Sequence, residues 1–456
     1  MTLKSGIINE LSGKKVLILG FGREGKSTYN FLRVNNVNCT IGIADKNDIT
    51  DESILKSGVL FHTGETYLNA MKDYDVIIKT PGISFKDVDL TEIKEKITSQ
   101  TELFLKYAGH KTIGVTGTKG KSTTSSLIYN MLVQSHKVLL VGNIGLPAFE
   151  MIDSYEDTDW YIYELSSHQL EFVKSSPKIC ALLNMFEEHL DHYVSYEAYK
   201  EAKRNIYKYQ KEEDYYVYNK SMADVINGER ELKQNLVAVS TEDFTNNSTY
   251  YSANEIKINV DGNTSILEVP KNMELKGIHN VYNASVAATI AKIAGASDED
   301  ILTGIATFKT LPHRLQEIGV YGGVTYIDDS ISTIPAATIS AVASVDNVDT
   351  IIVGGMDRGI NYEELIEFIH DGKVPNVILM YDSGKQIFEK VKTDTTANVI
   401  YADDLEKAVI LATQITAKGK TCIMSPAAAS YGVFKNFEER GDKFKEFVIK
   451  YTREND

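Results

Sequence analysis

Gly114-Val115-Thr116-Gly117-Thr118-Lys119-Gly120-Lys121-Ser122-Thr123-Thr124 lies between an apolar run and residues 125–133, whose pattern indicates a helix. A glycine-rich turn at the start of a helix aims several backbone N–H groups at one point, where the helix dipole also favours an anion. Lys121 adds a mobile positive charge for the terminal phosphates, and the Ser122 hydroxyl is a ligand for Mg²⁺. The stretch therefore predicts a site for a nucleoside triphosphate.

One position departs from the strict phosphate-binding loop. The strict spacing places its first glycine at position 115, where this chain has Val115, and Gly114 comes one residue early. The alternative interpretation is a glycine-rich turn that binds nothing. Phosphate binding through a variant loop is the favoured interpretation.

The composition indicates an acidic protein of several domains. Its 456 residues are enough for roughly two to four domains with sizeable cores. The formal net charge of −15 argues against a nucleic-acid partner, whose phosphates would be repelled. Three widely separated cysteines argue against a disulfide framework or a zinc site: Cys39, Cys180 and Cys422.

The chain lacks the sequence signals of membrane or secreted proteins. No apolar run approaches the ~20 residues that a membrane span needs, and the first eleven residues contain Lys4, Asn9 and Glu10, unlike a signal peptide. We therefore expect a soluble cytoplasmic protein, acting as a monomer.

Alternating apolar runs and helical patterns predict an α/β fold with mostly parallel sheets, in three domains. A Rossmann-like first domain, residues 1–107, has strands expected at 16–19, 40–44 and 76–78 and a helical stretch at 92–107. A central ATPase-type domain, residues 108–310, has strands expected at 113–116, 138–141, 160–164 and 179–184 and an alanine-rich helix at 284–294. Within it, residues 215–269 alternate polar and apolar side chains, which predicts a small antiparallel addition. A Rossmann-like third domain, residues 311–456, has strands expected at 326–327, 350–353, 377–380 and 421–424.

A second glycine-rich turn follows the first predicted strand. Gly20-Phe21-Gly22-Arg23-Glu24-Gly25, with Asp45 at the end of the second strand, matches the dinucleotide-binding fingerprint. Glycines permit the tight turn and the approach of phosphate, and the acid binds a ribose hydroxyl. From these residues alone, NAD or FAD, another nucleotide such as a nucleotide-sugar, and simple packing glycines remain open.

Acidic and histidine side chains near the phosphate loop are candidates for a metal site. Glu164 ends a predicted strand of the same domain, where a carboxylate can hold Mg²⁺ beside phosphates, although a lone strand-end glutamate is often only solvated. His189 and His192 belong to a polar loop that suits one Mg²⁺ contact better than a zinc site. Lys203 lies in an amphipathic helical pattern and, by composition alone, belongs to its solvated face.

Taken together, these motifs resemble the Mur ligases, ATP-dependent amide-forming enzymes that build the peptide stem of the bacterial cell wall. The matching residues span nearly the whole chain: 116–123 (TGTKGKST), 142–145 (GNIG), 164–167 (ELSS), 189–192 (HLDH), 201–203 (EAK), 277–284 (GIHNVYNA), 311–314 (LPHR) and 328–330 (DDS). Residues 425–430 (SPAAAS), residues 434–441 (FKNFEERG) and the first domain resemble the branch of the family that adds glutamate.

The resemblance assigns a ligand to each glycine-rich turn. The first domain would hold the UDP end of UDP-N-acetylmuramoyl-L-alanine through Gly22, Arg23, Asp45, Thr80, Pro81 and Gly82. ATP would contact Gly117, Thr118, Lys119, Gly120, Lys121, Ser122, Thr123, Asn143, Asn280, Asn283, Arg314 and Asp329. Two Mg²⁺ ions would be held by Ser122, Glu164, His189 and Lys203, the last of these carbamylated. The catalytic residues would be Lys121, His189 and Lys203.

The acceptor pocket departs from the pattern of the family. The family's usual lysine is Ile331 here, its asparagine is Ile334, and a second lysine is Arg358. The resemblance leaves Thr333, Arg358, Ser430 and Phe437 to receive the amino acid. Ile331 removes one positive charge from the pocket, and Arg358 replaces a lysine ammonium by a planar guanidinium group. The handedness of the glutamate therefore stays open at this point.

The implied reaction is ATP-dependent amide formation through an acyl phosphate, in peptidoglycan synthesis and hence in cell shape and division. D-glutamate is favoured over L-glutamate as the acceptor. The alternatives are a related ligase with another donor and acceptor, an NAD-dependent dehydrogenase built on residues 20–25, and a non-catalytic binding protein. The dehydrogenase leaves the loop around Lys121 unexplained, and intact Lys121, Glu164 and Lys203 argue against a non-catalytic protein.

Overall fold

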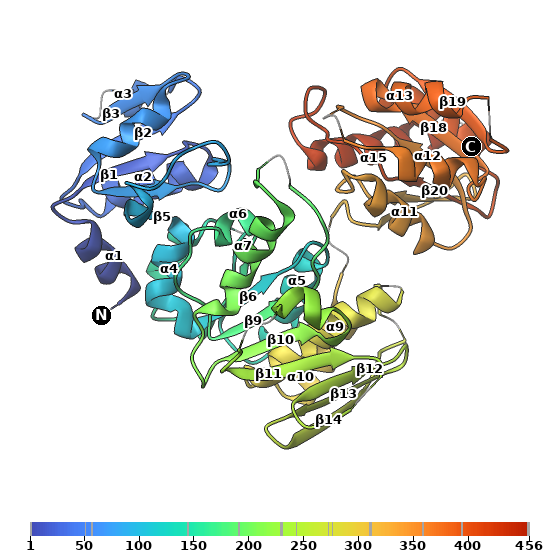
Figure 1. Ribbon diagram of the computed structural model, residues 1–456. Helices are drawn as coiled ribbons and strands as arrows, with labels where there is room; N and C mark the ends of the chain where they lie inside the picture. Colours follow the sequence, from blue (N-terminus) through green and yellow to red (C-terminus); the bar gives the residue numbers. More distant parts are fainter. Residues whose placement is uncertain are drawn as a thin grey trace. The chain divides into compact units, whose positions relative to one another are not determined.

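The computed structural model describes residues 2–50, 52–55, 58–143, 146–189, 192–228, 231–242, 244–271, 273–275, 277–309, 312–357, 360–393 and 395–453 (Figure 1). The chain forms two compact units. Unit 1 comprises Met1–Met273 with Gly277–Phe308, and unit 2 comprises Glu274–Lys276 with Lys309–Asp456. Unit 1 contains two sheets and unit 2 contains one, and this confirms the predicted three-domain α/β class.

The first sheet has five parallel strands in the order β3-β2-β1-β4-β5 (blue in Figure 1). Its strands are β1 (Lys15–Leu19), β2 (Thr40–Asp45), β3 (Leu60–Thr63), β4 (Val76–Lys79) and β5 (Ile97–Thr98). The accompanying helices are α1 (Leu3–Leu11), α2 (Arg23–Val34), α3 (Glu52–Leu55), η1 (Tyr67–Asp73), η2 (Lys94–Lys96), α4 (Gln100–Ala108) and η3 (Gly109–Lys111). The prediction of one helix over 92–107 was wrong, because buried Ile97 pairs beside β4 and Ser99 then starts α4 as its N-cap.

The second sheet has nine strands in the order β14-β13-β12-β11-β10-β9-β6-β8-β7. They are β6 (Thr112–Thr116), β7 (Val138–Gly142), β8 (Trp160–Glu164), β9 (Ile179–Leu182), β10 (Tyr215–Asn219), β11 (Asn235–Ser240), β12 (Ser248–Tyr251), β13 (Glu255–Val260) and β14 (Asn263–Glu268). Its helices are α5 (Lys121–Leu132), η4 (Ala148–Ser154), α6 (Ser167–Leu170), α7 (Tyr196–Lys208), η5 (Lys220–Met222), α8 (Ala223–Asn227), α9 (Ile278–Ile293) and α10 (Asp298–Thr307).

The predicted antiparallel addition is present and continues the central sheet. Antiparallel pairing joins β12 to β13 and β13 to β14, whereas β10, β11 and β12 pair in parallel and extend the parallel part. Asp261 and Gly262 both have positive φ, as a tight two-residue hairpin between β13 and β14 requires. Alternating burial occurs in β11 and in β13 alike, so the polar–apolar pattern did not reveal where the parallel strands end.

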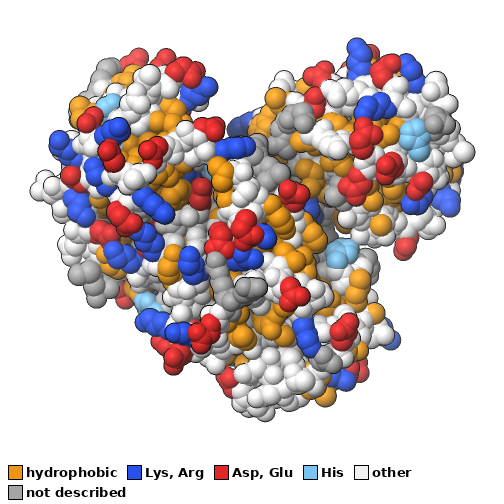
Figure 2. Space-filling view, viewed as in Figure 1, with side chains coloured by type: hydrophobic (Ala, Val, Ile, Leu, Met, Phe, Trp, Pro, Cys, Tyr) orange, Lys and Arg blue, Asp and Glu red, His pale blue; other side chains and the backbone are white. Residues whose placement is uncertain are grey.

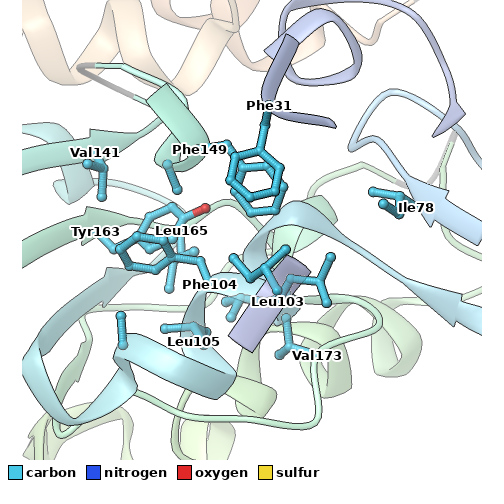
Figure 3. Packing of buried hydrophobic residues seen from close by; sticks show 14 of the residues in the cluster. Phe31, Ile78, Leu103, Phe104, Leu105, Val141, Phe149, Tyr163, Leu165 and Val173 are labelled. Atoms are coloured by element: carbon cyan, nitrogen blue, oxygen red, sulfur yellow. The ribbon is translucent and has the colours of Figure 1, made fainter. Parts of the chain in front are cut away.

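One apolar cluster joins the two sheets of unit 1 (Figure 3). Phe31 of α2 packs on Phe149 of η4 with ring centroids 4.8 Å apart. Phe104 of α4 sets its ring edge against Tyr161 and Tyr163 of β8. The Rossmann-like sheet and the central sheet therefore share a core, and residues from both can form one site.

Unit 2 has a six-stranded sheet in the order β15-β16-β20-β17-β18-β19, parallel except for β15. Its strands are β15 (Gln316–Tyr321), β16 (Val324–Asp328), β17 (Val348–Val353), β18 (Asn376–Met380), β19 (Asn398–Ala402) and β20 (Thr421–Met424). Its helices are α11 (Pro335–Ala343), α12 (Glu363–His370), α13 (Tyr381–Val391), α14 (Leu405–Ile415) and α15 (Phe437–Arg453). The four predicted strands are present as β16, β17, β18 and β20. The two edge strands were missed because both are partly exposed and lack a continuous apolar run.

The surface agrees with the charge balance of the sequence. Lys and Arg side chains are interspersed with Asp and Glu over the visible face (Figure 2). Among the described helices, none combines the length and the hydrophobicity needed to cross a membrane.

Candidate active site

The glycine-rich loop between β6 and α5 has a backbone that requires glycine. Gly120, the N-cap of α5, has a φ of +83°, and a Cβ there would lie 2.6 Å from the Asn283 side-chain oxygen. Asn184, which the sequence analysis missed, holds the loop from behind. It accepts from the Lys119 N–H at 2.8 Å and donates to the Lys119 carbonyl at 3.0 Å.

Lys121 lies in the first turn of α5, directly over this loop. Its Nζ donates to the carbonyls of Gly117 at 2.9 Å and Thr118 at 3.1 Å. Since Gly120 has no side chain, no side-chain cap bonds the first-turn N–H groups of α5. An ammonium group and the N-terminus of a helix thus lie at one loop, which is an arrangement that binds phosphate.

Glu164 ends β8, next to the strand end that carries Asn143. Glu164 is fully buried, and its Oε1 accepts from Asn143 Nδ2 at 3.1 Å. Its Oε2 is also buried and has no hydrogen-bond partner among the described residues. A buried carboxylate oxygen without a partner is costly, and a hard cation such as Mg²⁺ would satisfy it. The residues present therefore fit a magnesium ion.

Lys203 faces the interior, so the interpretation of a solvated face was wrong. The side chain is 2 % exposed, and its Nζ donates to Gly117 O at 2.9 Å and to Thr116 Oγ1 at 3.4 Å. Burial, reinforced by the charge of Lys121, lowers the pKa of Lys203 well below its ordinary value, although Glu188 and Glu164 act in the opposite direction. The fold thus disfavours the charged form of this amine.

Tyr199, one helical turn before Lys203, was also missed. Its ring lies 5.0 Å from Lys203 Nζ and 6.2 Å from the ring of His189, and its hydroxyl is 2.8 Å from Thr118 Oγ1. The signal was in the sequence, because Tyr199, Lys203 and Ile206 recur at the spacing of one buried helix face.

Three histidine rings form a cluster beside this helix, in which the ring of His168 packs edge to face with the other two. The ring of His168 lies 4.7 Å from that of His189 and 4.2 Å from that of His192. Burial, with the two neighbouring histidines, lowers the pKa of His168 to about 3. His189 itself has a φ of +61° and remains partly exposed, with its Nε2 3.7 Å from Glu188 Oε2. Leu190 and Asp191 of the same motif lie outside the described residues.

The predicted nucleotide-sugar residues gather at the carboxyl ends of β1, β2 and β4. Asp45 accepts from the N–H groups of Phe21 at 2.7 Å and Asn47 at 2.8 Å, so its carboxylate shapes the turn. Thr80 Oγ1 donates to Leu19 O at 3.0 Å. The strand order reverses between β1 and β4, which is where open α/β sheets bind ligands. Pro81 is half-buried, and the residues with greater exposure are Gly22, Arg23 and Gly82.

The remaining ATP residues of unit 1 lie on α5 and α9. Ser122 and Thr123 are buried in the first turn of α5. Asn283 Nδ2 donates to Asn280 Oδ1 at 3.3 Å, and both side chains are buried. Asn283 lies beside Gly120, and Asn280 is one helical turn before Asn283 on α9.

In unit 2, the predicted residues lie at the carboxyl edge of its sheet. Asp329 accepts from Ser425 Oγ at 2.7 Å and from the Leu315 N–H at 3.2 Å. Burial raises the pKa of Asp329 to about 6, against the lowering effects of Ser332, Ser425 and Arg314.

Among the described residues, the predicted acceptor residues Thr333, Ser430 and Phe437 occupy the same edge. The carbonyl of Phe437 accepts from Ser330 Oγ at 2.7 Å, Ser430 is buried, and Thr333 is half-buried. Arg440, which was not singled out, is fully buried and donates to Ser330 and Ala428, so it ties two of these loops together. Arg358 lies outside the described residues.

Comparison with known proteins shows similarity in the first domain, in the central domain and over nearly the whole chain. Residues 14–100 match the Mur ligase MurD-like N-terminal domain, and residues 115–291 match the Mur ligase middle domain. A protein of Clostridium acetobutylicum named UDP-N-acetylmuramoylalanine–D-glutamate ligase is 34% identical, covering 96% of this chain and 97% of its own length. A protein of Ligilactobacillus salivarius with the same name is 33% identical, covering 98% and 99%.

Solved structures share the fold at lower identity. MurF ligase from Thermotoga maritima, in complex with ADP, has a TM-score of 0.59 at 16% identity, covering 98% of this chain and 97% of its own. UDP-N-acetylmuramate-alanine ligase MurC from Thermotoga maritima has a TM-score of 0.56 at 17% identity, covering 97% and 100%.

Proposed function

The chain belongs to the Mur ligase family, and on that premise we propose that it joins D-glutamate to UDP-N-acetylmuramoyl-L-alanine while ATP is cleaved to ADP and phosphate. The product is a precursor of peptidoglycan. The observation that carries the proposal is the convergence of Lys121, Glu164 and Lys203 on one glycine-rich loop. The full-length relatives named as D-glutamate ligases support the choice of donor and acceptor.

The reaction needs two steps because hydroxide is a poor leaving group. The alanine carboxylate attacks the γ-phosphorus of ATP, forming an O–P bond as the bond to the ADP oxygen breaks. The amine of glutamate then attacks the acyl carbon, the C–O bond to phosphate breaks, and the amine gives up a proton. The first step brings two anions together, so the Lys121 ammonium and the N-terminus of α5 must neutralise charge.

The donor set for magnesium is proposed as Ser122, Glu164 and His189. The unsatisfied Oε2 of Glu164 supports it. Bound there, Mg²⁺ would supply positive charge to the phosphate oxygens. For Lys203, the buried amine with a lowered pKa supports carbamylation, in which the amine nitrogen bonds to the carbon of CO₂ and loses a proton. The resulting carboxylate would provide a ligand for a second ion.

The other roles remain predictions from the resemblance. For the UDP end these are Gly22, Arg23, Asp45, Thr80, Pro81 and Gly82, and for adenine Asn280 and Asn283. Arg314 and Asp329 are predicted for ATP, and Thr333, Arg358, Ser430 and Phe437 for the amino acid. A cytoplasmic monomer is likewise a prediction.

Phosphate release tests the proposal directly. The purified enzyme, with ATP, Mg²⁺ and UDP-N-acetylmuramoyl-L-alanine, is expected to release phosphate when D-glutamate is added and to form a product heavier by one glutamyl residue. L-glutamate is the matched control and is expected to give no product. Phosphate release with L-glutamate but not with D-glutamate would overturn the assigned acceptor. Absence of phosphate release with both isomers would overturn the proposed ligase activity.

A further inference from the structure

Residues 164–171 connect the candidate metal site to the Rossmann-like sheet. The segment begins at Glu164 and continues through the short helix α6 to Glu171. A capping box stiffens it: Ser166 Oγ accepts from the Gln169 N–H at 3.2 Å, and Gln169 Oε1 accepts from the Ser166 N–H at 3.0 Å. A shift of this segment would therefore move both of its ends together.

The first link to the Rossmann-like sheet is Gln169. Its Nε2 donates to Glu24 Oε1 at 2.7 Å. Glu24 directly follows Gly22 and Arg23, two of the residues predicted to hold UDP. The oxygen of the buried Gln169 amide therefore completes the capping box, and its nitrogen binds Glu24 beside the Rossmann-like sheet.

The second link is a buried ion pair. Glu171 Oε2 lies 3.1 Å from Lys79 Nζ, and the Lys79 side chain is 2 % exposed. Lys79 ends β4 and immediately precedes Thr80, and its ammonium also lies 5.7 Å and 5.6 Å from the ring centres of Phe85 and Phe172. Removing one partner of a buried pair leaves an uncompensated charge, so this link is hard to deform.

The same carboxylate oxygen contacts the histidine cluster. His192 Nε2 lies 3.2 Å from Glu171 Oε2, and the ring of His192 packs against that of His168, which in turn contacts His189. The His192 carbonyl also accepts from Ser84 Oγ at 2.9 Å. One carboxylate therefore joins the loop predicted to bind UDP to the loop of a proposed metal ligand.

We propose that Lys79 and Glu171 are positioning residues, which fix the UDP-binding loops relative to the phosphate-transfer site so that the bound sugar-nucleotide presents its carboxylate to ATP. The inference rests on the proposed function. The two residues act through the loops that they hold. Positioning of this kind is steep, because displacements near 1 Å cost large factors in rate.

Glu171→Gln tests the inference, since it keeps the size of the side chain and removes its charge. The Michaelis constant for UDP-N-acetylmuramoyl-L-alanine is expected to rise about tenfold, while that for ATP changes less than about twofold, because the loop around Lys121 is untouched. Lys79→Met, which keeps the length of the side chain between the two phenyl rings, is expected to give the same split and carries the test if Glu171→Gln does not fold.

Glu95→Gln is the matched control. Glu95 pairs with Lys174 across the same two sheets, at 2.7 Å, but the two side chains are 84% and 53% exposed, so this variant is expected to match the wild type. A merely structural role would lower the amount of folded enzyme, and with it the maximal rate, but would leave both Michaelis constants and the kcat of the folded enzyme unchanged, and that result would overturn the inference. An inactive wild type would overturn the proposed function and this inference with it, whereas an active wild type with an unchanged Glu171→Gln overturns the inference alone.

Discussion

Lys121→Ala is expected to lower kcat by a factor of about 100 to 1,000, the effect of losing one preorganised electrostatic contact to a transition state. The Nζ of Lys121 lies on the loop carbonyls of Gly117 and Thr118, where the terminal phosphates of ATP are proposed to bind. The residue is only half-buried, so the fold should survive its truncation. Phosphate release at saturating ATP measures the rate, and thermal unfolding checks the fold.

Lys208→Ala serves as the control for charge. Lys208 is an exposed residue at the end of α7, and its loss removes the same charge away from the loop. The control is expected to keep wild-type turnover. A loss of about a hundredfold is expected for Lys121→Ala. If its turnover stays within about twofold of the wild type, the loop has no role in the mechanism.

Lys203→Met is expected to abolish turnover and at the same time to stabilise unit 1. Activity is lost because methionine offers no amine for carbamylation. Stability rises because an amine buried at 2 % exposure is replaced by an apolar side chain of similar length, which removes the cost of burying a polar group, on the order of 1–3 kcal/mol in the free energy of unfolding. Urea unfolding at neutral pH, without nucleotide or bicarbonate, measures the gain.

The pH dependence of this gain has a definite sign. Burial lowers the pKa of Lys203 in the folded chain, whereas the unfolded chain keeps the ordinary value of 10.5. Between these two values the unfolded state binds the extra proton, so wild-type stability rises with pH across that window. Lys203→Met should lose this slope, and Lys208→Met should keep it. An unchanged slope, or turnover close to that of the wild type, would contradict the assigned role.

Local sequence patterns were sufficient for the buried central strands of the parallel sheets and for the glycine-rich loop. Apolar runs such as residues 16–19 become strands buried on both faces, and no distant residue is needed to see this. Gly120 and Lys121 are likewise defined by their neighbours in the sequence, because the turn and the start of the helix are local events.

The rest depended on contacts between distant residues. Lys203 looked solvated because composition does not tell which face of a helix is covered, although its spacing from Tyr199 and Ile206 carried that information. Asn184 and Arg440 were missed because each acts on a loop that is remote in the sequence. The Lys79–Glu171 pair has no local signal at all, since it exists only because the two sheets of unit 1 share a core.

The transfer of oxygen from substrate to phosphate tests the central claim most directly. UDP-N-acetylmuramoyl-L-alanine can be prepared with heavy oxygen in its terminal carboxylate and turned over with ATP and D-glutamate. Mass spectrometry then measures the mass of the released phosphate. If the carboxylate attacks the γ-phosphorus, each phosphate carries one heavy oxygen from the substrate. Phosphate without the label, in a reaction that still forms the amide, would contradict the acyl-phosphate account.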